Sequence, residues 1–277
     1  MRIFLAGGTG VIGRRLIPSL VAAGHDVTAT TRRLENVQSI QLLGADAAVV
    51  DVFDLSGLTQ VVSDATPDLI LHELTDLSDF DTDANARLRR EGTANLVAAA
   101  QAAGVERMIV QSIAWAYADG EGPAVEHDPI QPGSAVEVME GLVGRLPHAT
   151  VLRYGMLYGP DTWYAPGARM AQAATAGLLQ ATPAITSFAH IDDVVSATVQ
   201  SLDWPDGAYN IVDDEPAPAS VWLPKFAAAI GAPAPSTAEL ADGASPGRGA
   251  SNEKARAAGW TPRYATWRDT FTADTPK

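Results

Sequence analysis

A short apolar segment at the start of the chain runs directly into a glycine-rich turn. Residues 2–6 read Arg-Ile-Phe-Leu-Ala, and in the turn that follows glycine recurs at Gly7, Gly10 and Gly13. The next residues carry apolar side chains at helical spacing and end at Gly24. Strand, glycine turn and helix in this order predict the first unit of a doubly wound α/β sheet, because bare backbone N–H groups at such a helix start can approach a pyrophosphate.

The alternation of strand and helix continues beyond this first unit. The further expected strands are residues 26–31, 47–50, 68–72, 107–112, 151–154 and 208–212. The expected helices between them are 34–43, 55–63, 83–104 and 136–146, and another helix opens at 190–193. This alternation predicts an α/β fold with a Rossmann-type, doubly wound parallel sheet.

The chain is expected to divide into two domains. We predict an NAD(P)-binding Rossmann domain over 1–160 and a smaller substrate-binding lobe over 161–277, with about 186–212 returning to the Rossmann domain. Proline and alanine accumulate between Pro216 and Pro246, which is typical of an irregular, loop-rich lobe.

The glycine turn and the end of the second strand are the expected cofactor ligands. The turn residues that would face the pyrophosphate are Gly7, Thr9, Gly10, Val11, Ile12 and Gly13. The second strand ends at Thr31, Arg32 and Arg33, where an NAD-preferring site usually has an acid for the ribose 2′-OH. Two guanidiniums instead suit a 2′-phosphate, so we expect NADP rather than NAD. The alternative is that both arginines are ordinary solvated turn residues.

Polar residues also follow the third, fourth and fifth strands. In a doubly wound sheet these strand ends border the ligand crevice. Asp51 and Val52 are therefore candidates to border the adenine, with a solvated loop acid as the alternative for Asp51. The fourth strand ends in His72, Glu73 and Leu74. Glu73 and Leu74 are expected beside the cofactor, and His72 is either a catalytic candidate or a structural histidine.

Composition limits the partners of the chain. The 277 residues carry a formal net charge of −14, which argues against nucleic acid or an anionic membrane as a partner. The absence of cysteine and of a long apolar segment fits a cytoplasmic protein with a small-molecule substrate. The acids between Asp79 and Asn85 imitate a calcium loop, but Ala84 and Arg90 stand where the loop needs glycine and glutamate. No metal site is expected, and these acids are interpreted as a solvated loop and helix start.

Taken together, the motifs of nearly the whole chain resemble the extended branch of the short-chain dehydrogenase/reductase superfamily, which includes the NAD-dependent epimerases and dehydratases. The motifs are the glycine turn, Gly24-His25-Asp26-Val27, Asn85 with Glu91-Gly92-Thr93-x-Asn95, Tyr158-Gly159-Pro160, His190-Ile191-Asp192-Asp193, Tyr209-Asn210 and Gly259-Trp260-x-Pro262. The resemblance implies an NADP-dependent oxidoreductase or epimerase-like enzyme that acts on a small organic carbonyl or hydroxyl compound.

In that family a Tyr-x-x-x-Lys pair transfers the proton and a serine at the end of the fifth strand polarises the substrate oxygen. This chain has no lysine before Lys225. If Glu140 corresponds to the family's helix glutamate, Pro132 and Val136 stand in the two catalytic places. Ser112 remains a candidate for the serine, although in relatives the serine commonly lies one residue later. The resemblance therefore indicates an atypical active site.

Three functions stay open. A reductase or epimerase could use another proton donor, for which Ser112, Tyr117, Tyr154, His72 and His190 are candidates, although both tyrosines also fit structural positions. A non-redox cyclase, dehydratase or isomerase could use the same scaffold. A non-catalytic protein could sense NADP and signal to a partner.

The expected substrate residues lie in the C-terminal half of the chain. Trp163, His190 and Arg248 are the candidates, because aromatic rings with one cation suit an apolar or aromatic molecule that has a polar handle. Trp222 and Trp260 are interpreted as core residues of the lobe. Relatives often dimerise through the two long helices, here near 83–104 and 136–146, so a homodimer is a further expectation.

Overall fold

The computed structural model describes residues 1–77 and 81–271. The chain forms two compact units. The first unit comprises Met1–Ser112, Ile130–Leu152 and Thr198–Ala208. The second unit comprises Ile113–Pro129, Arg153–Ala197 and Tyr209–Lys277. Among the described residues, no helix is both long enough and apolar enough to cross a membrane.

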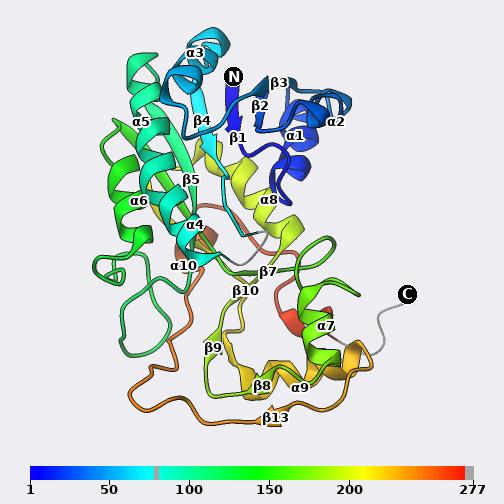
Figure 1. The fold of residues 1–277 in the computed structure, drawn as a ribbon. Helices are drawn as coiled ribbons and strands as arrows, with labels where there is room; N and C mark the ends of the chain where they lie inside the picture. Colours follow the sequence, from blue (N-terminus) through cyan, green and yellow to red (C-terminus); the bar gives the residue numbers. More distant parts are fainter. Residues whose placement is uncertain (78–80, 272–277) are drawn as a thin grey trace. The chain divides into compact units, whose positions relative to one another are not determined.

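The largest sheet among the described residues has seven strands in the order β11-β6-β5-β4-β1-β2-β3. Strands β1 to β5 are labelled in Figure 1. The strands are β1 (Arg2–Ala6), β2 (Asp26–Thr31), β3 (Asp46–Val49), β4 (Leu69–His72), β5 (Arg107–Ile113), β6 (His148–Tyr154) and β11 (Gly207–Ile211). The pairings of β1 with β2 and β4, of β2 with β3 and of β4 with β5 are parallel. The order reverses after β3, as in a doubly wound fold, so the expected α/β class is confirmed.

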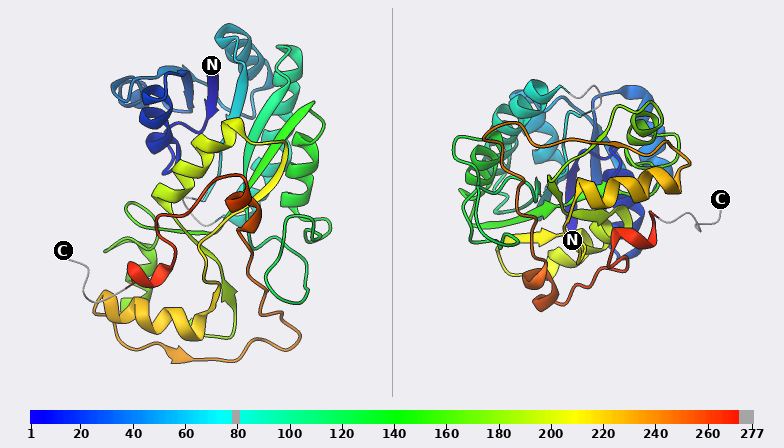
Figure 2. Two further views of the ribbon diagram at one scale, coloured as in Figure 1. Left: turned by 180° about the vertical axis from the view of Figure 1, so that it is seen from behind. Right: turned by 90° about the horizontal axis from the view of Figure 1, so that it is seen from below.

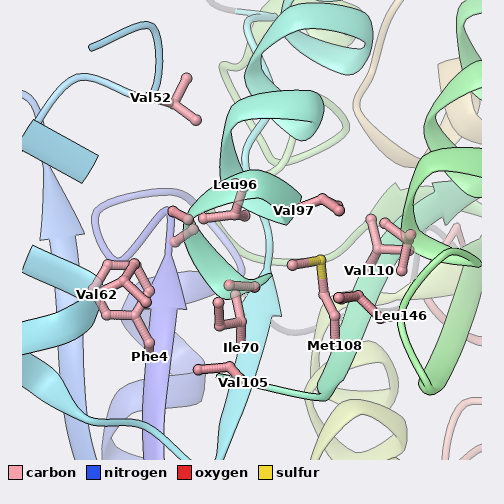
Figure 3. Close-up of a cluster of buried hydrophobic side chains, with 14 of the residues drawn as sticks. Phe4, Val52, Val62, Ile70, Leu96, Val97, Val105, Met108, Val110 and Leu146 are labelled. Carbon is pink, nitrogen blue, oxygen red and sulfur yellow. The ribbon is translucent and has the colours of Figure 1, made fainter. Parts of the chain in front are cut away.

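Side chains alternate between the two faces of this sheet. Phe4 and Ala6 of β1 belong to a buried cluster that also contains Ile70 of β4 and Met108 of β5 (Figure 3). This cluster lies under helices α3 (Leu55–Ala65), α5 (Thr93–Ala102) and α6 (Ala135–Val143). Helix α1 (Gly13–Ala22) lies on the other side of the strands, as the view from behind makes clear (Figure 2). The sheet therefore has helices on both faces, and its strand ends stay available to a ligand.

The expected helix over 83–104 consists of three helical segments. Helix α4 (Thr82–Arg87) is followed by a π-helical turn (Leu88–Gly92) and by α5. Asp81 caps α4, because its carboxylate accepts the backbone N–H groups of Asp83 and Ala84 at 2.9 Å each. This agrees with the interpretation of the acids as a helix start. Asp79, the first acid of the calcium-like pattern, lies outside the described residues.

The second unit is built from short strand pairs around an aromatic core. The pairs are β7 (Met156–Tyr158) with β10 (Phe188–His190), β8 (Gln180–Ala181) with β13 (Ser236–Thr237), and β9 (Ile185–Thr186) with β12 (Ala217–Pro218). Its helices include α7 (Arg169–Thr175), α8 (Ile191–Gln200, whose last residues belong to the first unit), α9 (Ala219–Ala229) and α10 (Glu253–Ala257). Phe188 packs edge-on against Tyr158, Tyr164 and Trp222 at centroid distances of 6.0, 5.5 and 5.3 Å.

The expectation of an irregular lobe is wrong for α9. This helix covers eleven residues and contains Pro224. It persists because Trp222, Leu223 and Phe226 are buried in the aromatic core, so tertiary packing outweighs the cost of the proline.

Candidate functional site

The turn between β1 and α1 leaves no room for a Cβ at Gly7, Gly8 or Gly13. Gly7 has φ +105°, and a Cβ there would lie 2.9 Å from the backbone oxygen of Glu73. A Cβ on Gly13 would collide with the backbone oxygen of Gly7. The turn is therefore folded tightly on itself and on the end of β4, and at Gly7 and Gly13 only glycine avoids a collision with backbone atoms.

Backbone donors gather at the start of α1. The N–H groups of Gly8 and Gly10 are bonded within the protein, to the oxygens of Thr30 and Gly7 at 3.1 Å each. The N–H groups of Val11, Ile12 and Gly13 have no acceptor among the described residues. Free donors at the positive end of a ten-residue helix form an anion site. The glycine cradle and these donors fit the pyrophosphate of a dinucleotide.

The end of β2 presents two arginines to solvent. The hydroxyl of Thr31 accepts the backbone N–H of Arg33 at 3.1 Å and holds the turn. Arg32 and Arg33 are exposed, and the described part of the chain offers neither guanidinium an ion-pair or hydrogen-bond partner. Both cations are thus available to an added anion.

The residues after β3 differ in their exposure. Asp51 is exposed, and its carboxylate accepts the backbone N–H of Phe53 at 2.9 Å. Val52 is 7% exposed and packs in the core cluster, where a Cβ on Gly92 would lie 3.1 Å from its side chain. The side chain of Val52 therefore packs against the helices. Of the two residues predicted to border the adenine, only Asp51 has an exposed side chain.

His72 is completely enclosed at the end of β4. Its Nδ1 accepts the backbone N–H of Leu74 at 3.3 Å, so its Nε2 carries the proton and donates to the hydroxyl of Thr93 at 2.9 Å. Burial, together with the charge of Arg89, lowers the pKa of His72 to about 4. The imidazole is neutral near pH 7 with both nitrogens bonded, which favours the structural alternative over a catalytic role. The adjacent Glu73 is also buried.

Ser112 lies near the end of β5 and is bonded to helix α6. Its hydroxyl donates to a carboxylate oxygen of Glu140 at 2.6 Å, and the residue is only 1% exposed. Arg89 lies near enough for its charge and that of Glu140 to interact, although burial lowers the pKa of its guanidinium. Sequence reasoning treated Glu140 only as a reference position for the family motif. No local pattern marks it as the partner of a residue 28 positions earlier.

Pro132 and Val136, the two positions that the sequence motifs predict for the family's catalytic pair, carry side chains without an acidic or basic group. Pro132 is exposed in the segment before α6, whose N-cap is Ser134. Val136 is 4% exposed and points into the core side of α6. Neither side chain can exchange a proton.

The two candidate tyrosines belong to the second unit. The hydroxyl of Tyr117 donates to the side-chain oxygen of Asn210 at 2.6 Å and accepts a hydrogen bond from Arg153 at 2.8 Å. Burial raises the pKa of Tyr117, and the charge of Arg153 partly opposes this shift. Tyr154 is 3% exposed at the end of β6. Both tyrosines are thus built into the interior of this unit.

A pocket of about 230 Å³ opens in the second unit. We call it the second-unit pocket, and it is lined by residues 114–115, Tyr117, Met156, 185–187 and 247–249. The predicted substrate residue Arg248 lies in its wall, within the last of these segments. Trp115, which is 55% exposed, was missed by the sequence reasoning. The available signal was its position two residues beyond the end of β5.

Trp163 and His190 do not line this pocket. Trp163 is partly buried against the aromatic core of the second unit. His190 stacks on Tyr264 with ring centroids 3.6 Å apart, and its Nδ1 accepts the backbone N–H of Asp192 at 3.2 Å. In this structure both residues have packing roles. Within the described residues, no three His, Asp or Glu side chains are grouped to hold a metal ion.

The doubly wound sheet with a glycine turn at the start of α1 defines the class of dinucleotide-binding α/β proteins. The model of the NAD dependent epimerase/dehydratase family matches residues 3–212. The chain belongs to this family, and it is an enzyme of the NAD(P)-dependent oxidoreductase and epimerase type. The resemblance seen in the sequence motifs is therefore confirmed.

Among characterised relatives, a 3-diazoavenalumate denitrifying reductase from a Streptomyces species is 40% identical over 97% of this chain and 98% of its own length. A 4-hydroxy-2-methyl-3-oxo-4-farnesyl-3,4-dihydroquinoline-1-oxide ketoreductase from Stigmatella aurantiaca is 34% identical, but over 48% of this chain and 39% of its own. The full-length similarity to the first relative identifies the chain as a reductase of the family.

Solved structures of similar fold are more distant in sequence. The Bordetella bronchiseptica enzyme WbmG, in complex with NAD and UDP, has a TM-score of 0.81 at 20% identity, covering 98% of this chain and 92% of its own. The UDP-glucose 4-epimerase of Thermus thermophilus, in complex with NAD, has a TM-score of 0.76 at 22% identity, covering 99% and 100%. These likenesses establish the shared fold.

Proposed function

We propose that this chain is an NADP-dependent reductase that acts on an electrophile whose reduction needs no proton from the protein. The observation that carries this proposal is that no lysine precedes Lys225, while Pro132 and Val136 stand where the motifs predict the family's proton-transfer pair. A nicotinamide cofactor, when bound, supplies the hydride. The glycine turn would hold its pyrophosphate, and Arg32 with Arg33 would hold the 2′-phosphate that distinguishes NADP from NAD.

The hydrogen bond of Ser112 supports the same proposal. A family serine that polarises a carbonyl must donate a hydrogen bond to the substrate oxygen. Here the hydroxyl of Ser112 donates its hydrogen bond to Glu140, with 2.6 Å between the two oxygens. Toward a substrate the serine oxygen can then offer only lone pairs. A hydroxyl bonded in this way stabilises positive charge better than developing negative charge on oxygen.

A diazo-bearing arene is the substrate class that fits these properties. In the net reduction of an arenediazonium ion, R–N₂⁺ + H⁻ gives R–H + N₂. The hydride forms the new C–H bond, the C–N electron pair leaves with dinitrogen, and NADPH is oxidised to NADP⁺. No proton is consumed, so neither the tyrosine nor the lysine of the usual pair is required. The Streptomyces relative is a 3-diazoavenalumate denitrifying reductase, and its similarity over the full length of this chain supports this substrate class.

Carbonyl reduction is the second candidate. The partial similarity to the Stigmatella ketoreductase favours it. In this case the oxygen of the substrate would take its proton from water or from another side chain, because Ser112 is committed to Glu140. A non-redox or NADP-sensing role has no specific support in the described residues.

Turnover with matched substrates tests the proposal. The purified chain is mixed with NADPH and either 4-hydroxybenzenediazonium or 4-hydroxybenzaldehyde, and the loss of reduced nicotinamide is followed together with the product by mass spectrometry. We expect phenol and dinitrogen from the diazonium, above the rate without protein, and no 4-hydroxybenzyl alcohol. Faster reduction of the aldehyde than of the diazonium would favour the second candidate.

Three further features belong to the same proposal. We infer that 1–160 holds the cofactor, and that 161–277, with about 186–212 returning to the Rossmann domain, provides the larger part of the substrate site. We also infer a cytoplasmic location from the absence of cysteine and a homodimer formed through the helices at 82–102 and 135–143. A gel-filtration mass equal to that of one chain would contradict the proposed homodimer.

A further inference from the structure

We propose that the second-unit pocket binds the planar, uncharged aromatic body of the substrate and rejects nucleotide diphosphates. The inference rests on the proposed function, because it names the part of the substrate that the pocket would hold. It is carried by the charge balance of Arg248, by the bonding of the other polar groups in the wall, and by the size and character of the surface that remains.

The charge of Arg248 is compensated inside the protein. Its guanidinium forms an ion pair with Asp128 at 2.8 Å and donates to the backbone oxygens of Gly122 and Glu121 at 2.9 and 3.1 Å. The side chains of Arg248 and Asp128 are 12% and 21% exposed. The backbone N–H of Val125 and the charge of Arg248 hold the pKa of Asp128 below its usual range, so the carboxylate remains ionised. A diphosphate would therefore meet a neutral pair and not a free cation.

Tyr117 and Ser187, two other polar residues of the pocket wall, also form hydrogen bonds within the protein. Tyr117 uses its hydroxyl as donor to Asn210 and as acceptor from Arg153. The hydroxyl of Ser187 accepts the backbone N–H of Ala250 at 2.9 Å. A ligand gains little by hydrogen bonding to groups that are already bonded, since each new bond would replace an existing one.

The remaining surface is apolar and aromatic. The indole of Trp115, the thioether of Met156 and the side chain of Ile185 contribute it, and more than half of Trp115 is exposed. A cavity of about 150 Å³ accepts a benzene ring. The second-unit pocket, at about 230 Å³, has room for a ring with a short conjugated substituent. Ring stacking on Trp115 and contact with the Met156 sulfur favour a planar aromatic ligand.

Calorimetric titration of the full chain tests the inference without turnover. The probes are methyl 4-hydroxycinnamate, which is planar and uncharged, its acid 4-hydroxycinnamate, which carries one negative charge, and UDP. We expect the ester to bind most tightly. Trp115→Ala should weaken ester binding by about tenfold, because the stacking surface is lost. The matched control Leu178→Ala, at a 75% exposed position of the same unit, should leave binding unchanged.

The substitution Asp128→Asn tests the charge balance of Arg248 without changing the shape of the pocket. Asparagine still accepts the N–H of Val125 but leaves the charge of Arg248 uncompensated. We expect the ratio of the affinity for 4-hydroxycinnamate to the affinity for the ester to be several-fold higher in this variant than in the unchanged chain. Two results would overturn the inference. One is that Trp115→Ala leaves ester binding intact. The other is that UDP binds more tightly than the ester and that Arg248→Ala removes this UDP binding. Ester binding without diazonium turnover would instead count against the proposed function alone.

Discussion

The hydroxyl of Ser112 donates to the carboxylate of Glu140 at 2.6 Å, from the end of β5 to helix α6. Because a carboxylate oxygen can only accept, Ser112 is the donor in this bond. Ser112 is thereby held as an acceptor toward any ligand at the strand end. If Ser112 takes the place of the family's serine, its hydroxyl cannot donate the hydrogen bond that such a serine gives to a substrate oxygen while it donates to Glu140.

Ser112→Ala is expected to reduce stability more than activity. The substitution removes the hydrogen bond that Ser112 donates to a half-buried carboxylate, which should cost about 1–3 kcal/mol of unfolding free energy. Diazonium reduction should retain its rate within about tenfold, because the serine proton is not used in the reaction. Thermal unfolding and single-turnover NADPH oxidation measure the two effects. A loss above about a hundredfold in rate with unchanged melting temperature would mean that Ser112 donates to the substrate.

Replacing both Arg32 and Arg33 by alanine should remove the preference for NADPH. The two guanidiniums are exposed and have no partner among the described residues, so their loss should not disturb the fold. NADPH binding should weaken by about 1–3 kcal/mol as the charged bonds to phosphate are lost, while NADH binding stays constant. Fluorescence titration with both cofactors measures the difference. Arg145→Ala, also exposed, is the control, and equal affinity of the unchanged chain for NADH and NADPH would contradict the assignment.

Gly13→Ala and Gly141→Ala form a matched pair of glycine substitutions in helices. The Cβ that Gly13→Ala introduces would collide with the backbone oxygen of Gly7, so we expect the turn to distort and cofactor binding to be lost. Around Gly141 in α6 nothing lies within 4 Å of the new Cβ. That substitution should stabilise the chain by about 0.5–1 kcal/mol, because alanine is the better helix former. Cofactor binding retained by Gly13→Ala would show that the tight turn is not required.

Much of the first unit could be predicted because its signals are local. Apolar strands, glycine turns and polar strand ends follow one another along the chain, and parallel strands bring those ends to one edge. The glycine turn and the arginines after β2 were found in this way. The partner of Ser112 was not, because Glu140 lies on a helix 28 residues later and nothing in its neighbours marks the contact.

The second unit was harder to predict, because its features depend on contacts between distant segments. The second-unit pocket combines residues near 115, 156, 186 and 248, a juxtaposition that no spacing rule provides. Helix α9 was missed because Pro224 and the surrounding proline and alanine suggest loops. Only the burial of Trp222 and Phe226 explains why the helix forms.

Two buried groups give the chain opposite responses to pH. Asp213 is 2% exposed and accepts the backbone N–H groups of Glu215 and Trp267, at 3.2 and 2.9 Å. Burial outweighs these bonds and raises the pKa of Asp213 from 3.8 to about 8. Burial of His72 instead lowers its pKa from 6.5 to about 4. The folded chain therefore binds a proton at Asp213, and gives one up at His72, relative to the unfolded chain.

The direction of each effect follows from which state holds more protons. Between pH 6.5 and about 8 only the folded chain keeps the Asp213 proton, so stability should fall as pH rises, by about 1 kcal/mol per pH unit. Between about pH 4 and 6.5 the unfolded chain binds a proton at His72, which lowers stability as pH falls. In this lower range the two slopes oppose each other and should largely cancel.

Single substitutions separate the two groups. Asp213→Asn imitates the protonated side chain, so the fall in stability between pH 6.5 and 8 should disappear. His72→Gln removes the opposing group, so stability should rise on acidification from pH 6.5 toward 4, driven by Asp213 alone. Urea unfolding of the three chains across this pH range measures the slopes. An unchanged slope in Asp213→Asn between pH 6.5 and 8 would mean that the carboxyl is ionised in the fold, because its two backbone N–H bonds then outweigh the cost of burial.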